Sequence, residues 1–448
     1  MLSRLWQLYK RFQLRSSPQL NLVLGFLLYT IIGWLLLCLP VFHNTSISIL
    51  DNLFISTSAI STTGLVTVSV GDDYNFWGQL IIMALIQVGG IGYMTLTTYY
   101  LLLTTSSITR WHQKIIGTAF TMPKSIQVSD FLKSVILFTL IMELLGAAGF
   151  YWAFRHEGVS GGQALWDGVF HSVSAFCTAG FGLYNNSFED FKDHTGINLI
   201  ISILAICGSL GFIVITDLWY RIRGKTRKLT FTTMIILVGF LMLLAFGTLL
   251  TFFSEPQVQD LPIYTRWLTS FFQSMTAMTT VGFNTISTGA LTLPILLSVV
   301  FLMYIGASPS GTAGGMKITT LTAMISILKS RLKGDKHVSF MGRRIPYERL
   351  YVATATFVLY TSIIFLATFL MSFTEKDQDL EDLLFEVASA LGTVGLSVGV
   401  TGELSVTGKV LMIILMFTGR VGVLTFGFAL LNRKSKGIPE FVEDDIAV

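Results

Sequence analysis

The same short pattern occurs four times in this chain, and no copy contains a gap. Its form is [D/T]-x-x-F-x-x-x-[S/T]-A-x-x-T-x-G-[L/F], with four positions identical in every copy and three more alike. The copies run over residues 51–65, 167–181, 269–283 and 382–396. Internal repetition of this kind predicts pseudo-symmetric structural units about a shared axis.

The composition places these copies in a membrane protein. The 448 residues are 52% hydrophobic and only 12% charged, with a mean hydropathy of +0.68. Soluble domains are normally about 25% charged, so this chain is outside their range. Three cysteines are too few for a disulfide framework and are expected to be small buried side chains.

Long apolar segments alternate with the four copies. A helix needs about 20 apolar residues to cross the bilayer core. Eight segments meet this length, at residues 19–40, 77–103, 131–154, 196–220, 230–254, 291–328, 350–373 and 407–432. One copy lies between the two members of each successive pair. Because each copy is too short to span, it predicts a re-entrant segment.

We therefore expect an all-α membrane protein with four pseudo-symmetric helix–pore loop–helix repeats around one central ion pore. The predicted boundaries of these repeats, which together form one transmembrane domain, are residues 1–109, 110–224, 225–345 and 346–448.

The charged residues predict the orientation of the chain. Most of the 30 Lys and Arg residues fall on one side of the predicted spans, including those in 221–228 and 329–349. This bias predicts cytoplasmic N- and C-termini in a multi-pass protein of the inner (plasma) membrane. Most acidic residues fall on the other side. They either form a negative outer vestibule that attracts cations or belong to ordinary solvated loops.

The residue types in each copy suit a cation site. Asp51, Asp167, Thr269 and Asp382 are suitable N-cap residues for a short helix, and the shared Phe is expected to pack that helix against its neighbours. The C-terminal end of such a helix carries about half a negative charge. The glycine then permits a positive φ, which lets successive carbonyls point the same way.

Four such loops around one axis could replace the hydration shell of a cation, as the four TVGYG loops of potassium channels do. A single Thr-x-Gly would more simply be a helix C-cap, so the prediction depends on all four copies. All four keep Gly, which favours a ring that admits K⁺. The predicted ligands are the backbone carbonyls of Thr62, Thr63, Gly64, Thr178, Ala179, Gly180, Thr280, Val281, Gly282, Thr393, Val394 and Gly395.

These loops, the eight spans and a glycine-rich break in the sixth span resemble the Ktr/Trk/HKT superfamily of potassium transporters. The likeness covers nearly the whole chain and is greatest to KtrB, the membrane subunit of bacterial Ktr systems. The resemblance implies a homodimer in the lipid bilayer with one pore per subunit. It also implies a cytosolic ring of nucleotide-binding regulatory subunits of the KtrA or TrkA type. The transported ion would be K⁺, with Na⁺ possible, and this chain itself would bind no nucleotide and no nucleic acid.

The resemblance also assigns a gate. In the family, the break in the sixth span is an intramembrane loop below the filter, and an Arg in the last span lies near it. The corresponding residues in this chain are Gly311, Thr312, Gly314, Gly315, Lys317 and Arg420. The alternative is a passive kink caused by Pro309 and its glycine neighbours.

Two other features have simpler explanations. Glu143, a charge within the third span, is expected to make a structural hydrogen bond or ion pair. The glycine pairs 89/92, 208/211 and 419/422 are expected to allow close packing of the inner helices.

The sequence thus predicts potassium uptake through a channel-like pore, possibly sodium-dependent. The alternative is a sodium-coupled potassium symporter with alternating access. A membrane-embedded hydrolase is disfavoured, because the six His residues are scattered and no HExxH or Gly-x-Ser-x-Gly occurs. We therefore do not expect an enzyme.

Overall fold

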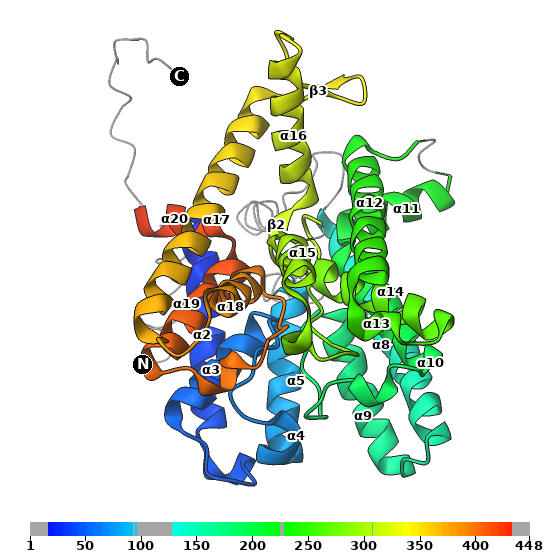
Figure 1. Ribbon diagram of the computed structural model, residues 1–448, viewed down its shortest axis with the longest axis vertical. Helices are drawn as coiled ribbons and strands as arrows, with labels where there is room; N and C mark the ends of the chain where they lie inside the picture. The colour runs from blue at the N-terminus through cyan, green and yellow to red at the C-terminus, as the bar shows by residue number, and fades with distance from the viewer. Residues whose placement is uncertain (1–16, 93–94, 96–127, 225–227, 307, 432–448) are drawn as a thin grey trace.

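The computed structural model describes residues 17–92, 95, 128–224, 228–306 and 308–431. It consists mainly of helices, and each copy of the pattern begins on a helix that lies between two others in the chain and ends in the loop that follows (Figure 1). Several features of the sequence analysis lie outside the described residues. They are the basic residues at Arg4, Lys10, Arg11 and Arg15, the predicted repeat boundaries near 110 and 225, and the tail after Leu431.

The elements fall into four groups, each containing one copy of the pattern. The first group comprises α2 (Pro18–Leu37), η1 (Pro40–Phe42), α3 (Ile49–Ile60), α4 (Val70–Asp73) and α5 (Phe76–Ile91). The second comprises α8 (Val128–His156), α9 (Gly161–Phe176), η2 (Glu189–Phe191), α10 (Thr195–Ser209) and α11 (Phe212–Ile222).

The third group comprises α12 (Phe231–Ser254), α13 (Pro256–Gln259), α14 (Ile263–Thr279), η3 (Thr288–Ala290), α15 (Leu293–Tyr304), β1 (Ile305–Gly306), β2 (Met316–Lys317) and α16 (Ile318–Leu332). The fourth comprises β3 (Ser339–Phe340), β4 (Arg343–Arg344), α17 (Tyr347–Thr374), α18 (Leu380–Gly392), η4 (Val400–Glu403), α19 (Val406–Val421) and α20 (Val423–Leu431). Strands β1 and β2 pair in parallel, and β3 and β4 form an antiparallel hairpin.

Four helices in the described part of the chain are long and apolar enough to cross a membrane, namely α2, α8, α12 and α17. The second long segments of the second and fourth groups are bent, which the prediction of single spans did not include, and that of the third group is interrupted, as predicted. Helices α10 and α11 meet at 93° and α19 and α20 at 102°, while α15 stops at Tyr304. Gly211 and Gly422 lie at these bends with φ of 83° and 93°, a conformation that only glycine adopts without strain.

The helices of the pattern copies start earlier than predicted. Ser48 and Asp379 are the N-cap residues of α3 and α18, so Asp51 and Asp382 lie in the first turn. Asp167 and Thr269 lie well inside α9 and α14. The prediction that these four residues cap the helices was therefore wrong, because Ser48, Ser160 and Asp379 stand upstream as caps and α14 begins after Pro262. The shared phenylalanines are fully buried, as predicted.

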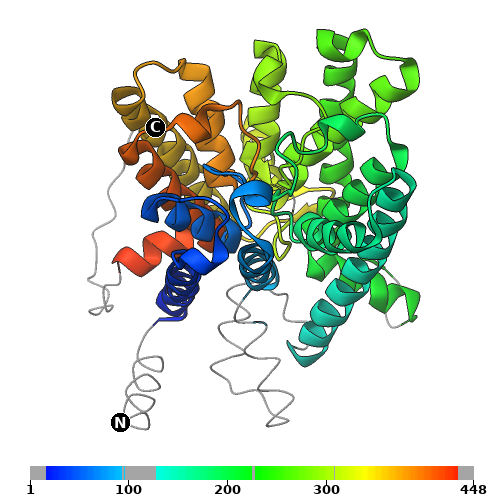
Figure 2. The same cartoon turned by 90° about the horizontal axis from the view of Figure 1, so that it is seen from below.

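The short helices pack in a closed cycle. Each contacts the helices of its own group, and it also contacts the helix that follows the copy in the preceding group. The contacts between groups are α5 with α9, α10 with α14, α15 with α18, and α19 with α3. The fourth group thus returns to the first, and the view from below shows the groups surrounding the middle of the molecule (Figure 2).

Carboxylates join the helices that flank a copy. Glu255, which follows α12, accepts hydrogen bonds from the backbone N–H and the hydroxyl of Thr292, the N-cap residue of α15. Glu375, which follows α17, accepts the same two bonds from Ser405, the N-cap residue of α19. Such bonds satisfy helix N-termini that would otherwise lack partners.

A salt bridge closes the cycle at its outer edge. The Lys409 ammonium in α19 lies 2.8 Å from the Asp51 carboxylate in α3, so it joins the last group to the first.

Candidate functional site

The four Thr-x-Gly loops have the same backbone conformation. Their threonines, Thr62, Thr178, Thr280 and Thr393, have φ between 48° and 57°. Their glycines, Gly64, Gly180, Gly282 and Gly395, have φ between 66° and 94°. A β-carbon makes this left-handed region unfavourable, so four threonines there are unusual. The same unfavourable threonine conformation therefore occurs in every copy, which indicates that the surrounding fold holds it in place.

One backbone hydrogen bond recurs in every loop. The N–H of the middle residue donates to the carbonyl of the Ser or Thr that precedes the shared Ala. The four bonds are Thr63 to Ser58 at 2.9 Å, Ala179 to Ser174 at 2.8 Å, Val281 to Thr276 at 3.2 Å, and Val394 to Ser389 at 2.8 Å. In two copies the Ser hydroxyl also accepts from the N–H of the loop glycine, namely Gly64 N to Ser58 and Gly395 N to Ser389, each at 3.1 Å.

The four loops contact one another in a ring. A β-carbon added to Gly64 would overlap the carbonyl oxygen of Ala179 in the next copy. The same relation holds for Gly180 with Val281, for Gly282 with Val394, and for Gly395 with Thr63. The last pair returns to the first copy. The predicted ligand residues of all four copies are thus brought together, in chain order, around one centre.

The threonine side chains extend this ring on the side of the helix ends. All four are fully buried. The Thr178 hydroxyl donates to the Thr312 hydroxyl at 3.0 Å, and the Thr280 hydroxyl accepts from the N–H of Gly314 at 3.2 Å. Within the described residues, the hydroxyls of Thr62 and Thr393 have no hydrogen-bond partner. Two oxygens of this layer therefore remain available to another ligand.

A polar cavity of about 350 Å³ adjoins the ring, and Gly64 and Gly395 lie in its wall. Its polar lining includes Asn185, Asn186, Glu189, Asn284, Ser287, Ser397 and Thr401. The amide of Asn284 donates to the Glu189 carboxylate at 2.7 Å. Most of these groups are neutral, so the lining is less acidic than the loop composition predicts.

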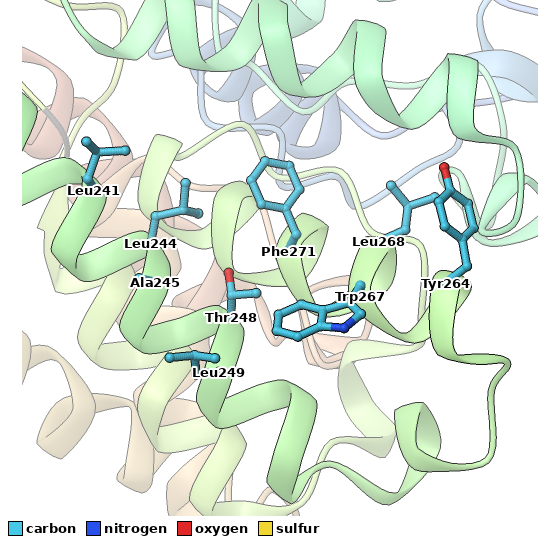
Figure 3. Close-up of a pocket in the computed structure, with 9 residues that line it drawn as sticks. All are labelled: Leu241, Leu244, Ala245, Thr248, Leu249, Tyr264, Trp267, Leu268 and Phe271. Carbon is cyan, nitrogen blue, oxygen red and sulfur yellow. The ribbon is translucent and has the colours of Figure 1, made fainter.

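A larger cavity of about 540 Å³ lies elsewhere, between α12 and α14 (Figure 3). Its wall consists almost entirely of carbon, from residues such as Leu241, Leu244 and Phe271. It offers few ligands for an ion, so we do not assign the ion site there.

The break in the sixth predicted span lies directly against the ring. A β-carbon on Gly314 would overlap the Thr393 hydroxyl, and one on Gly311 would meet the carbonyl of Ser209. Together with the bonds of Thr312 and Gly314 described above, segment 306–317 contacts three of the four ring threonines. Gly315 takes φ of 67°, and the pairing of β1 with β2 closes the segment into a loop.

Two cationic side chains bind this loop by its carbonyls. Lys317 donates to the carbonyls of Ala313 and Gly314 at 2.6 and 2.7 Å. Arg420, in α19, donates to the carbonyl of Thr312 and to those of Gly89 and Gly90 in α5. The guanidinium thus links three groups of the fold beneath the ring.

The glycine pairs of the inner helices have two separate tasks. A β-carbon on Gly89, Gly208 or Gly419 would overlap the carbonyl of Ile60, Phe176 or Leu391, two residues before each ring threonine. These first glycines serve close packing, as predicted. Of the second glycines, Gly211 and Gly422 form the bends described above, which the packing argument did not predict, and Gly92 is the C-cap residue of α5.

Glu143 has the structural role expected for it, because its carboxylate accepts a hydrogen bond from Gln87 at 3.0 Å. Sequence reasoning missed the serines that bind the ring glycines, although Ser or Thr at that position in every copy was a visible signal. It also missed His171 and Glu386, which lie behind the loops.

Comparison with known proteins shows the family of this chain. The TrkH family model, described as "Cation transport protein", matches residues 19–434. The Ktr system potassium uptake protein B of Bacillus subtilis is 34% identical over 95% of both chains. The protein of the same name from Vibrio alginolyticus is 33% identical, over 98% of this chain and 96% of that protein.

A potassium/sodium uptake protein of Enterococcus hirae is 32% identical over 95% of this chain and 96% of that protein. Among solved structures, the potassium transporter TrkH from Vibrio parahaemolyticus has the same fold, with a TM-score of 0.76 and 20% identity over 93% of this chain and 85% of that one. The extent of the family match and of the relatives establishes that this chain belongs to the TrkH family of cation transport proteins.

Proposed function

We propose that this protein conducts K⁺ into the cell through the ring of four Thr-x-Gly loops, which acts as a selectivity filter. The observation that carries this proposal is the cyclic contact of each filter glycine with a carbonyl oxygen of the next copy. Four loops arranged in this way supply backbone oxygens on all sides of one centre. Backbone that is not helical is tolerated at membrane depth where it is buried or lines a water-filled path.

The chemistry of the ring suits a dehydrated monovalent cation. Carbonyl oxygens replace the hydration shell of K⁺ in such filters. Helices α3, α9, α14 and α18 end directly before the ring, and each C-terminal end contributes about half a negative charge. The membrane potential contributes about 2.3 kcal/mol per charge for each 100 mV, so uptake can be concentrative without further chemistry.

The choice of K⁺ rests on two observations. Two relatives that match nearly the whole chain carry the name of potassium uptake proteins. All four filter positions are glycine. The relative named for potassium and sodium uptake makes Na⁺ a second ion to be tested.

We further propose that segment 306–317 is a gate beneath the filter, with Gly311, Thr312, Gly314, Gly315, Lys317 and Arg420 as its functional residues. In the described conformation the loop lies against three filter threonines, and Arg420 fixes it to α5. Displacement of the loop would then open the path from the filter to the cytosol.

Rubidium flux into liposomes tests the filter assignment. We expect Gly282→Ser and Gly395→Asp to abolish flux or reduce the preference for Rb⁺ over Na⁺, since a β-carbon at either glycine overlaps a filter carbonyl. Gly402→Ser is the matched control. Gly402 lies in the wall of the polar cavity of about 350 Å³ beside the ring, which we call the outer cavity, and an added β-carbon there would have nothing within 4 Å. Unchanged flux and preference in both filter variants would refute the assignment.

The same liposomes separate a pore from a sodium-coupled symporter. A pore supports Rb⁺ flux in the complete absence of Na⁺, with a rate that follows the imposed membrane potential. A strict requirement for Na⁺, with a fixed ratio of the two ions, would favour alternating access instead.

The assembly expected from the resemblance also remains a proposal. We propose a homodimer in the inner membrane with cytoplasmic termini and a cytosolic regulatory ring of the KtrA or TrkA type. The names of two relatives, which are B proteins of Ktr systems, support a system with further components. The hairpin of β3 and β4, which carries the exposed Arg343 and Arg344, projects beyond the helices and offers a basic surface for a partner (Figure 1).

Co-purification with a regulatory subunit tests this assembly, and light scattering of the purified protein gives its oligomeric state. A monomeric protein that retains no subunit at low salt would contradict it.

A further inference from the structure

The position after the shared phenylalanine differs among the four copies. It holds Ile55, His171, Gln273 and Glu386, all of them fully buried within the short helices. Burial of a charged or polar side chain is costly unless hydrogen bonds satisfy it. A carboxylate and an imidazole in such places therefore require an explanation.

Both carboxylate oxygens of Glu386 accept hydrogen bonds from the segment that follows the fourth filter loop. One carboxylate oxygen accepts from the backbone N–H of Val398 at 3.1 Å and from the Ser397 hydroxyl. The other accepts from the Thr401 hydroxyl. Ser397, Val398 and Thr401 line the outer cavity beside the filter, whereas the Glu386 side chain does not. Glu386 therefore fixes the wall of this cavity from behind.

His171 holds the corresponding segment of the second copy, at Leu183, two residues before the cavity-lining Asn185. Its Nε2 accepts from the backbone N–H of Leu183 at 3.2 Å, and its Nδ1 lies 2.7 Å from the carbonyl of Asp167. Because the Leu183 N–H can only donate, Nε2 must be unprotonated, and Nδ1–H donates to Asp167. The ring is thus neutral and oriented at both nitrogens.

The two anchors are equivalent in position. Each accepts from a backbone N–H that is 12 residues further along the chain. The anchored residues also support the neighbouring copies. A β-carbon on Gly71 would overlap the carbonyl of Leu183, and one on Gly289 would meet the carbonyl of Val398. The segment after the first loop therefore packs against the segment after the second, and the segment after the third loop packs against the segment after the fourth.

We propose that Glu386 and His171 are positioning residues that fix the outer mouth of the filter at two places and thereby set its ion selectivity. This inference rests on the proposed function of the ring. Neither side chain lines the cavity, so both act through the backbone of residues 183 and 397–401. The ring carbonyls keep a spacing suited to K⁺ only while the segments that leave the filter are held.

The test compares two buried carboxylates of the same group. Glu386 and Glu375 each accept hydrogen bonds from a backbone N–H and a hydroxyl, but Glu375 lies at the outer ends of α17 and α19, away from the filter. Rubidium and sodium flux into liposomes would be measured for Glu386→Ala, Glu386→Gln and Glu375→Ala, together with thermal stability in detergent.

We expect Glu386→Ala to lower the Rb⁺/Na⁺ flux ratio by about tenfold or more, the factor that one lost hydrogen bond to a charged group is worth. Glu386→Gln should restore the ratio to within about twofold, because its amide oxygen can still accept from Val398 and its NH₂ can donate to Thr401. Glu375→Ala should lower stability and leave the ratio unchanged. His171→Ala should lower the ratio, and His171→Gln should partly restore it.

A folded Glu386→Ala protein with the wild-type ratio would overturn the inference, as would an equal change in Glu375→Ala. If Glu386→Ala does not fold, Thr401→Val removes the partner hydroxyl and leaves the carboxylate in place. A wild-type ratio in that variant would equally overturn the inference. Wild-type protein and Gly395→Asp are measured first. If the wild type carries no Rb⁺, the proposed function itself fails, which is a result distinct from a selective pore with a dispensable Glu386.

Discussion

Replacement of Arg420 by alanine should open the path beneath the filter. The guanidinium donates to the carbonyl of Thr312 in segment 306–317 and to the carbonyls of Gly89 and Gly90 in α5. Release of the segment requires that the bond to Thr312 breaks. A hydrogen bond to a charged group contributes about 1.5–3 kcal/mol, which corresponds to a shift of about tenfold to about 150-fold in the ratio of released to bound loop.

The assay is the initial rate of rubidium uptake into liposomes at a fixed membrane potential. We expect the rate for Arg420→Ala to rise by a factor in that range, up to the rate of the fully open pore. Arg420→Lys should give an intermediate rate, because an ammonium retains the charge but cannot reach both sites with a planar fork.

Arg266→Ala provides the matched control. Arg266 also donates to a backbone carbonyl, that of Phe252, and its guanidinium lies over the Phe252 ring, but it is remote from the loop. Its loss should lower stability without changing flux. If a folded Arg420→Ala protein conducts at the wild-type rate, Arg420 does not restrain the gate and the reasoning is wrong.

Three further predictions concern the architecture around the ring. Glu255→Ala leaves the N–H of Thr292 without its acceptor, so it should destabilise the protein by about 1–3 kcal/mol in thermal unfolding and leave the Rb⁺/Na⁺ ratio intact. Gly208→Ala places a β-carbon on the carbonyl of Phe176 and should lower the free energy of unfolding by about 1–3 kcal/mol. Gly162→Ala, with open space around it, should change that free energy by no more than about 0.5 kcal/mol. Equal effects of the two substitutions would contradict the packing argument. A double-mutant cycle with Asp51→Asn and Lys409→Met should give a coupling of about 1 kcal/mol or less, because the pair is partly exposed, and a much larger value would mean that this salt bridge dominates the closure of the ring.

Sequence reasoning could predict the features that depend on local patterns. The glycine of each Thr-x-Gly was expected to permit a positive φ, and all four glycines have one, whereas the positive φ of the four threonines was not predicted. The shared phenylalanines are buried, and the glycine-rich segment 306–317 does interrupt its helix. These outcomes follow from the intrinsic preferences of glycine, proline and large apolar side chains.

Other features depend on contacts that carry no local signature. Arg420 binds backbone carbonyls that are 108 and 330 or 331 residues away, and a carbonyl is present at every residue. The bends at Gly211 and Gly422 were missed because a pair of glycines fits close packing equally well. The helix starts were misplaced because Ser48 and Asp379 are as suitable for capping as the aspartates that follow them.

The position after the shared phenylalanine offered a signal that could have been used. Histidine, glutamine and glutamate occur there on short helices that the sequence predicts to lie within the membrane, and an ionisable group in such surroundings normally has a dedicated partner. Comparison of the copies position by position would have identified Glu386 and His171 without a structure. It would not have identified their partners, which include the backbone N–H groups of Leu183 and Val398.

The closed sequence of contacts from Gly64 to Ala179 and finally from Gly395 back to Thr63 lies within a single polypeptide. A tetramer of identical subunits must change all four quarters whenever one codon changes. In this chain a substitution changes the sequence of one quarter alone, so the third can carry the interrupted helix and the fourth the arginine that binds it. The same linkage has a drawback, since a distortion in any quarter is passed to both neighbours. Tolerance to substitution should therefore be lowest at the four glycines, where the quarters meet.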